Sequence, residues 1–266
     1  MLSKLFRRLV EFLIKIYRRK TKDNPSPTPT PNPKPPVDPK PVHPWRICPL
    51  GEYWRNLHPR HVTPSKKHPD GITTVKGHCV TNPSGKDQLY SEEMQLIAEK
   101  NFGQFKLIPL PEIPEFQKKD LVYDHIIQGW TQYWNDVLKP QEPLDPCLVK
   151  ALIATESGFN SNAWNKKHGR QRARGLTQVT DQTLRYLSDD YHELKDHFLH
   201  LKEDETLDPN FSICAGIRWL FRKKEIANSK IGRKASWIDA VGEYKHYKMD
   251  DPNMQKFIEI YKELKI

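Results

Sequence analysis

The chain has 266 residues, of which 36% are hydrophobic, and it carries a formal net charge of +10. This composition suits a soluble protein with one sizeable core and long polar appendages. Residues 1–24 hold eight Lys or Arg and two acidic residues, so they carry +6 of the charge and leave only +4 for the rest. A nucleic-acid-binding domain concentrates positive charge on a folded face or groove, so this distribution argues against a nucleic-acid partner.

The first predicted element is a basic amphipathic helix within residues 1–23. Charged residues in 2–20 recur at steps of three and four, and apolar residues fill much of the opposite face. Glu11 and Lys15 interrupt the apolar run, so it fits neither a membrane-spanning helix nor the apolar region of a cleaved signal peptide. We expect residues 1–20 to lie on an anionic membrane surface. The alternatives are docking on an export or assembly complex and packing on the chain's own domain.

A linker and a small module are predicted to follow this helix. Residues 24–44 are dominated by Pro, Thr, Ser and Lys, which predicts an extended linker that buries no core. Residues 45–119 are predicted to form a small β-rich module and a connecting helix. Within the module, Asp70-Gly71 before Ile-Thr-Thr-Val is typical of a hairpin. Ser91 is the predicted N-cap of the connecting helix.

The cysteines and histidines of the module allow two kinds of cross-link. Cys48 and Cys79 bracket one small segment, so we expect them to pair if the compartment is oxidising. Cys147 and Cys214 are either a second pair or isolated buried thiols. Four histidines between residues 45 and 85 raise a zinc hypothesis, but their spacing matches no standard site. We therefore predict no metal and no cofactor.

From residue 120 to residue 266 the pattern predicts an all-α domain. The apolar residues of 123–137 recur with helical spacing, and we interpret most of them as core. Five helix starts are signalled by residues that cap helix N-termini, three of them followed by proline at the first helical position: Asp145-Pro146, Asp208-Pro209, Asp251-Pro252, Thr180 and Ser236.

Glu156 is the candidate catalytic residue of this domain. Helical spacing from Pro146 places it on the same face as Leu152 and Ile153, and Gly158 ends the helix just beyond it. A carboxyl on the buried face of a helix end is costly to ionise, which raises its pKa and suits it to act as a general acid. Taken alone, a solvated glutamate at a helix end would be the simpler interpretation. The surrounding motif reverses that preference.

Two blocks near Glu156 carry a family resemblance. Ala-Leu-Ile-Ala-Thr-Glu-Ser-Gly-Phe-Asn (151–160) is followed by Ala-Arg-Gly-Leu-Thr-Gln (173–178). They resemble the catalytic-Glu segment and the Gly-Leu-Met-Gln turn of soluble lytic transglycosylases, members of the lysozyme-like superfamily. Residues 210–220 resemble the helix that follows in that family, and residues 243–245 read Glu-Tyr-Lys where the family usually has Ala-Tyr-Asn. The resemblance covers about residues 121–250.

The resemblance implies a lysozyme-like peptidoglycan lytic transglycosylase, of bacterial or phage origin, that cleaves the MurNAc–GlcNAc β-1,4 bond. Glu156 would protonate the bridging oxygen and then accept a proton from the 6-hydroxyl, leaving a 1,6-anhydro-MurNAc end. Ser157, Thr177 and Gln178 would line the glycan cleft. Tyr244 would form a hydrogen bond near the Glu156 carboxyl.

Departures from the family pattern keep other functions open. Lys245 replaces the family asparagine, and Glu243 and Asp239 lie close to Tyr244 in the sequence. Either acid could act as a second carboxylate that positions a water, which would make the enzyme a muramidase used in wall remodelling or as an antibacterial effector. A further alternative is a peptidoglycan-binding adaptor without activity. All of these predict a location in the cell envelope, in the periplasm or at a membrane, or secretion.

Overall fold

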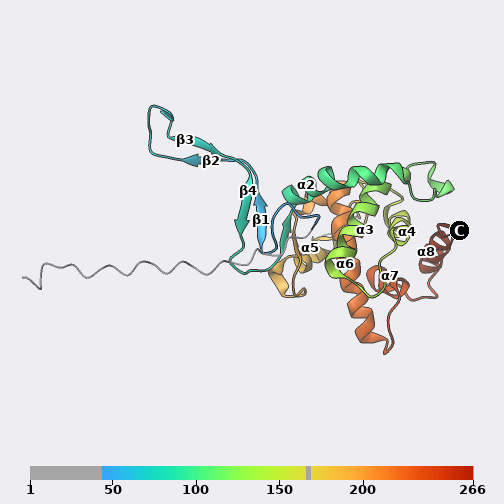
Figure 1. Ribbon diagram of the computed structural model, residues 1–266. Coiled ribbons are helices and arrows are strands. Elements are labelled where there is room, and N and C mark those ends of the chain that lie inside the picture. Colours follow the sequence, from blue (N-terminus) through green and yellow to red (C-terminus); the bar gives the residue numbers. More distant parts are fainter. Residues whose placement is uncertain (1–43, 166–168, 266) are drawn as a thin grey trace, which may run out of the picture. The chain divides into compact units, whose positions relative to one another are not determined.

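The computed structural model describes residues 44–165 and 169–265 (Figure 1). The predicted N-terminal helix of residues 1–23 and nearly all of the predicted linker of residues 24–44 lie outside the described residues. Among the helices that are described, none combines the length and apolar character that crossing a membrane requires.

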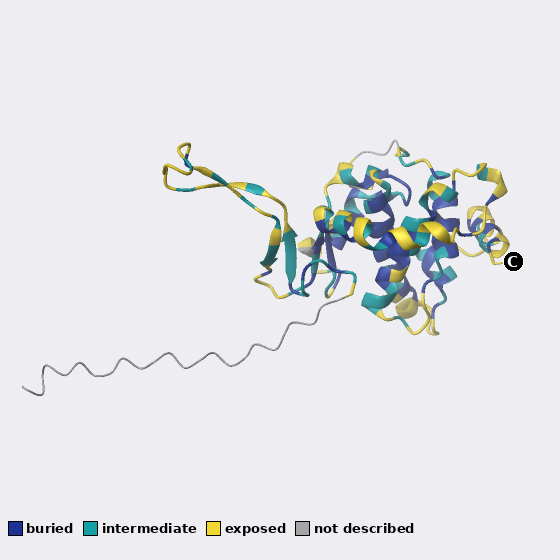
Figure 2. Ribbon diagram, turned by 45° about the horizontal axis from the view of Figure 1, so that its top comes forward, coloured by how far each residue is buried: buried dark blue, intermediate teal, exposed yellow. Residues whose placement is uncertain are grey.

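The first described elements form the predicted β-rich module, which consists of two antiparallel strand pairs: β1 (Glu52–Arg55) with β4 (His78–Thr81), and β2 (His58–His61) with β3 (Ile72–Val75). A disulfide joins Cys48 to Cys79, which confirms the predicted pair, while Cys147 and Cys214 are free and buried. The predicted hairpin is also confirmed. The β2–β3 hairpin is largely exposed, whereas most buried residues lie in the helices (Figure 2).

Helices dominate the remaining described residues: α2 (Ser91–Asn101), α3 (Asp124–Leu138), α4 (Pro146–Ser157), α5 (Asp181–Leu187), α6 (Pro209–Lys230), α7 (Trp237–Lys245) and α8 (Pro252–Glu263). Short 3-10 helices connect them: η1 (Phe102–Leu107), η2 (Pro114–Phe116), η3 (Leu121–Tyr123), η4 (Gly169–Gln171), η5 (Asp189–Tyr191) and η6 (Glu203–Leu207). Helix α6 is the central element, because α2, α3, α5 and α7 all pack against it.

The five helix starts predicted in the all-α region are confirmed. At each, the predicted side chain accepts a hydrogen bond from a backbone N–H of the first turn: Asp145, Thr180, Asp208, Ser236 and Asp251. The prediction for Ser91 is wrong, because Tyr90 is the N-cap of α2 and Ser91 is its first residue. The Ser91 hydroxyl instead donates to the Glu205 carboxylate at 2.8 Å. The Ser91 hydroxyl is thus engaged by Glu205, which is distant in sequence, and it does not cap α2.

The prediction that residues 120–266 contain only helices is wrong in detail. Three short strands lie there: β6 (Ala173–Arg174), β7 (Val179–Thr180) and β8 (Phe198–His200). Strands β6 and β7 form a small antiparallel pair, and β8 pairs in parallel with β5 (Gln88–Tyr90). Strands of two or three residues are too short to show the alternation by which a strand is recognised. The β5–β8 pair also crosses the predicted domain boundary between residues 119 and 120.

The core fixes α3 and α4, and α4 carries Glu156. The prediction that most apolar residues of 123–137 belong to the core is confirmed for the aromatic residues Trp130, Tyr133 and Trp134, which are all at most 1% exposed. Helix α4 is buried from its second residue through Ala154. Lys150 on α4 is fully buried, and its Nζ lies 2.9 Å from carboxylate oxygens of two acidic residues just before and at the start of α3, Asp120 and Asp124. These contacts tie the first half of α4 to the start of α3.

Candidate active site

Glu156 lies in the last turn of α4, where the helix reaches a cleft. Gly158 caps the helix with a φ of 56°, a conformation that glycine adopts without a steric penalty. The Glu156 side chain is 17% exposed. It lines a cleft of about 810 Å³ formed by the ends of α4 and α7, the β6–β7 turn, and parts of α5 and α6.

The carboxylate of Glu156 forms an ion pair with Lys245, the last residue of α7. Lys245 Nζ lies 2.5 Å from Glu156 Oε1 and 3.2 Å from Thr155 Oγ1. The Lys245 side chain is only 4% exposed. The residue that departs from the family pattern is therefore the one that touches the candidate acid.

Two opposing influences set the protonation of Glu156. Burial raises the pKa of Glu156 above its ordinary value, and attraction to the Lys245 ammonium lowers that pKa in part. The rise due to burial is the larger effect. The group can thus hold a proton at higher pH than an exposed glutamate, and it faces a cation that stabilises its carboxylate form.

The turn between β6 and β7 forms one wall of the cleft. Gly175 has a φ of 74°, and a Cβ at this position would collide with the carbonyl oxygen of Thr206. The Gln178 side chain lines the cleft, and its Nε2 donates to the carbonyl oxygens of Gly175 at 2.8 Å and Ala163 at 3.1 Å. The glycine and the amide of the motif therefore shape the turn itself, and the Gln178 amide nitrogen is held by the backbone.

Tyr244 connects this turn to α7. Its hydroxyl donates to the backbone oxygen of Thr177 at 2.7 Å, and its ring lines the cleft beside Glu156. Burial raises the pKa of Tyr244 well above its ordinary value, and the Glu156 charge adds to the rise. Tyr244 thus stays a neutral hydrogen-bond donor. Thr177 is fully buried, and its hydroxyl donates to the Ser212 carbonyl oxygen at 2.7 Å.

Four predicted site residues do not line this cleft, and one of them is the fully buried Thr177. Ser157 turns its hydroxyl back onto its own helix, where it donates to the Ile153 carbonyl oxygen at 3.3 Å. The two candidate second carboxylates line a different hollow and have their own cations. Glu243 lies 2.6 Å from Lys230 Nζ, and Asp239 binds Arg233 and accepts a hydrogen bond from the Ser236 backbone N–H.

The structure adds cleft residues that the sequence analysis did not identify as site residues. Glu193 is the other carboxylate that lines the cleft among the described residues, and Arg222 Nε holds it at 2.8 Å. Tyr186 and Trp219 line the cleft as a stacked pair, with ring centroids 5.7 Å apart. Lys223 lines it too. No short motif links these residues. Trp219 and Lys223 lie one turn apart on α6, whereas Tyr186 is on α5 and Glu193 follows η5.

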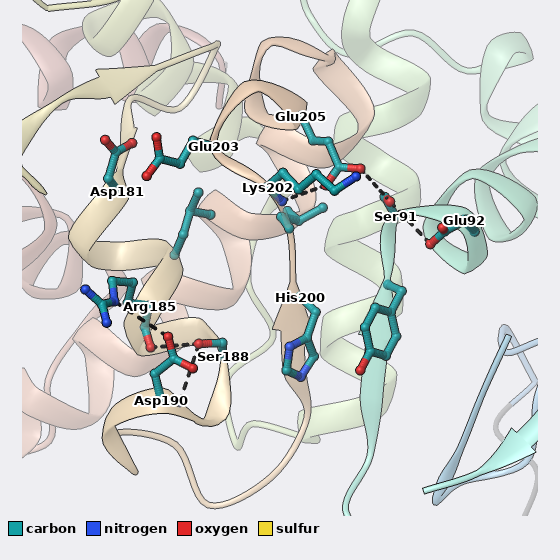
Figure 3. Close-up of a pocket in the computed structure, with 13 residues that line it drawn as sticks. Ser91, Glu92, Asp181, Arg185, Ser188, Asp190, His200, Lys202, Glu203 and Glu205 are labelled. Carbon is teal, nitrogen blue, oxygen red and sulfur yellow. Dashed lines mark hydrogen bonds and ion pairs between the residues drawn. The ribbon is translucent and has the colours of Figure 1, made fainter. Parts of the chain in front are cut away.

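A second pocket, of about 550 Å³, lies among β5, α5 and the segment after β8 (Figure 3). It is rich in carboxylates, but its charged groups are largely held by one another. Arg185 pairs with Asp190, and Glu205 accepts hydrogen bonds from the Ser91 hydroxyl and the Lys202 backbone N–H (Figure 3). It contains no predicted site residue. The cleft at Glu156 is therefore the candidate active site.

Residues 135–248 match a family model, the Transglycosylase SLT domain. This match confirms the resemblance that the sequence motifs indicate. The chain carries a lysozyme-like domain of this kind, which supports a peptidoglycan-cleaving function. Glu156, the Gly175–Gln178 turn and Tyr244 all lie within the matched residues. No curated protein matches the chain.

Proposed function

We propose that the protein is a peptidoglycan lytic transglycosylase that cleaves the MurNAc–GlcNAc β-1,4 bond with Glu156 as its general acid and base. The observation that carries the proposal is a largely buried carboxyl that lines a cleft within an SLT domain and whose pKa is raised by burial. A general acid must hold a proton when it acts, and burial favours the protonated form of Glu156.

In the proposed reaction, protonated Glu156 gives its proton to the bridging oxygen as the glycosidic bond breaks. The acetamido group of the sugar stabilises the cationic centre, and Lys245 stabilises the carboxylate that Glu156 becomes. Glu156 then accepts the proton of the sugar's 6-hydroxyl, whose oxygen bonds to the anomeric carbon and closes the 1,6-anhydro ring. The proton returns to Glu156, so the cycle needs no water, metal or cofactor.

The arrangement of carboxylates favours this route over hydrolysis. Glu243 and Asp239 line another hollow, so neither supports a second carboxylate beside Glu156. A muramidase is the second candidate because Glu193 does line the cleft. Its carboxylate is already bound by Arg222 Nε at 2.8 Å, so it is less free to position a water.

Mass spectrometry of the fragments released from purified sacculi tests the proposal. We expect anhydro-muropeptides, each lighter by one water than the reducing product of hydrolysis. A Glu193→Gln variant is expected to give the same anhydro products at a similar rate. Reducing ends that disappear in this variant would instead identify a muramidase. Binding to sacculi without release of fragments would identify an adaptor.

We further propose that the protein acts in the cell envelope and that residues 1–20 attach it to an anionic membrane. The cationic, amphipathic sequence of this segment supports the proposal. Deletion of residues 2–20 is expected to abolish sedimentation with vesicles that contain anionic lipid and to leave the cleavage of isolated sacculi unchanged. Vesicle binding that survives the deletion contradicts this assignment and favours a protein partner or another part of the chain.

A further inference from the structure

Lys223 on α6 is a buried cation that lines the candidate active-site cleft. The residue is only 7% exposed, and its Nζ lies 5.0 Å from the centroid of the Trp219 ring. Within residues 44–165 and 169–265, no carboxylate lies in ion-pair distance of this ammonium and no hydrogen bond reaches it. A buried charge without an anionic partner is costly, and proteins seldom keep one without a use.

The neighbouring cations of α6 show what is unusual about Lys223. Arg222 binds the carboxylates of Glu193 at 2.8 Å and Glu225 at 2.7 Å. Lys224 is as buried as Lys223, at 8% exposed, and it too lies over an aromatic ring, but its Nζ is 3.1 Å from a Glu142 oxygen. Of these three consecutive cations, Lys223 alone lacks a carboxylate among the described residues.

The carboxylates that act electrostatically on Lys223 are already held by other cations. Glu193 is bound by Arg222, and Glu243 by Lys230 at 2.6 Å. Burial lowers the pKa of Lys223, with partial compensation from these two acids. His246, which also lines the cleft, has its pKa lowered by burial and by the Lys223 charge. An anion entering the cleft would relieve this uncompensated positive charge.

We infer that Lys223 binds a carboxylate of the glycan substrate and makes the cleft select peptidoglycan over uncharged N-acetylglucosamine polymers. The inference rests on the proposed function. Every MurNAc carries a lactyl group whose carboxyl is either free or linked to a peptide that bears carboxylates of its own. GlcNAc carries neither. The stacked Tyr186 and Trp219 rings form the adjacent wall of the cleft, beside the ammonium.

The test measures binding by calorimetry in the Glu156→Gln background, so that no ligand is cleaved. Three ligands are compared: glycan strands freed of peptide, glycan strands that bear peptides, and chitohexaose. Adding Lys223→Met is expected to weaken binding of at least one carboxylate-bearing ligand by about tenfold or more, the typical value of a hydrogen bond to a charged group. Chitohexaose binding is expected to change less than about twofold, the scatter expected where no charged contact is lost.

Lys224→Met in the same background is the matched control, because this residue shares the helix, the burial and the ring contact of Lys223 but lines another hollow. It is expected to leave the binding of all three ligands unchanged. Lys223→Met is also expected to unfold at a temperature no lower than its parent, since it removes an unpaired buried charge.

The ligand that loses affinity identifies the group bound. Loss confined to peptide-free strands points to the lactyl carboxylate, and loss on peptide-bearing strands points to the peptide. Three results would overturn the inference. They are an equal loss of affinity for all three ligands, an unchanged affinity for both carboxylate-bearing ligands, and no binding of those two ligands by the parent. Failure of the proposed function is a separate result, namely that the unsubstituted protein releases nothing from sacculi.

Discussion

Replacing Glu156 by glutamine is expected to lower the release of glycan fragments from purified sacculi by about 10³-fold, the usual contribution of a general acid–base group. The amide cannot protonate the bridging oxygen, and no other carboxylate of the described residues lines the cleft except Glu193. The measurement is the initial rate of muropeptide release, followed by chromatography and mass spectrometry.

The fold is expected to survive this substitution. Glutamine has the shape of glutamate, and its amide oxygen can still accept from Lys245 Nζ. Circular dichroism should therefore match the parent, while the unfolding temperature should fall, because the Lys245 ammonium, only 4% exposed, loses its anionic partner. Glu225→Gln, a largely exposed acid on α6, is the control and should retain full activity. A Glu156→Gln enzyme that kept more than a tenth of the parent rate would show that another group supplies the proton.

Much of the local structure could be predicted from the sequence because its causes are local. An acceptor followed by proline fixes a helix start through contacts within three residues, and all three Asp-Pro pairs do so. Glu156 could be placed at a helix end because the apolar stripe and Gly158 lie within one turn of it. The family motif then supplied the role that spacing alone leaves open.

The surroundings of Glu156 could not be predicted, because they depend on segments far apart in the chain. Lys245 meets Glu156 across 89 positions, and the family pattern offers no lysine there. Glu243 and Tyr244 are sequence neighbours, yet only Tyr244 lines the cleft, since adjacent helical residues point about 100° apart. The β5–β8 pair likewise joins residues more than a hundred positions apart.

The Lys245–Glu156 pair can serve both halves of the proposed reaction. Burial favours the protonated acid that starts bond cleavage, and the ammonium favours the carboxylate that must then take the 6-hydroxyl proton. A pKa raised by burial alone would make the first step easy and leave a poorly stabilised anion after it. The Lys245 ammonium stabilises this anion, and the pKa of Glu156 still stays above its ordinary value.

Replacing Lys245 by methionine is expected to destabilise the protein at pH 7 by about 3 kcal/mol, because it leaves a buried carboxylate without its cation. This free energy is at the lower end of the usual range for removing one partner of a buried ion pair, because the Glu156 side chain is still 17% exposed to water. Urea unfolding across a pH series measures it. Lys256→Met is the control, because its pair with Glu115 is more than half exposed on both sides and should contribute less than about 1 kcal/mol.

The pH dependence of the Lys245→Met variant separates an electrostatic cause from lost packing. The pKa of Glu156 already lies above its ordinary value of 4.5 because of burial, and removing the lysine takes away the attraction that lowers it. A carboxyl with a higher pKa in the folded than in the unfolded state stabilises the fold below its unfolded pKa, and this stabilisation is lost as pH rises through the folded pKa. The variant should therefore regain stability on acidification toward pH 4.5, relative to the parent.

The higher pKa of Glu156 in this variant should also move the alkaline limb of the activity profile to higher pH, because Glu156 would stay protonated up to a higher pH. In the double variant with Glu156→Gln no ionisable acid remains at this position, so the extra pH dependence should vanish and much of the lost stability should return. A Lys245→Met variant whose loss of stability is the same at every pH would mean that the lysine acts through packing, and the electrostatic account of this pair would then fail.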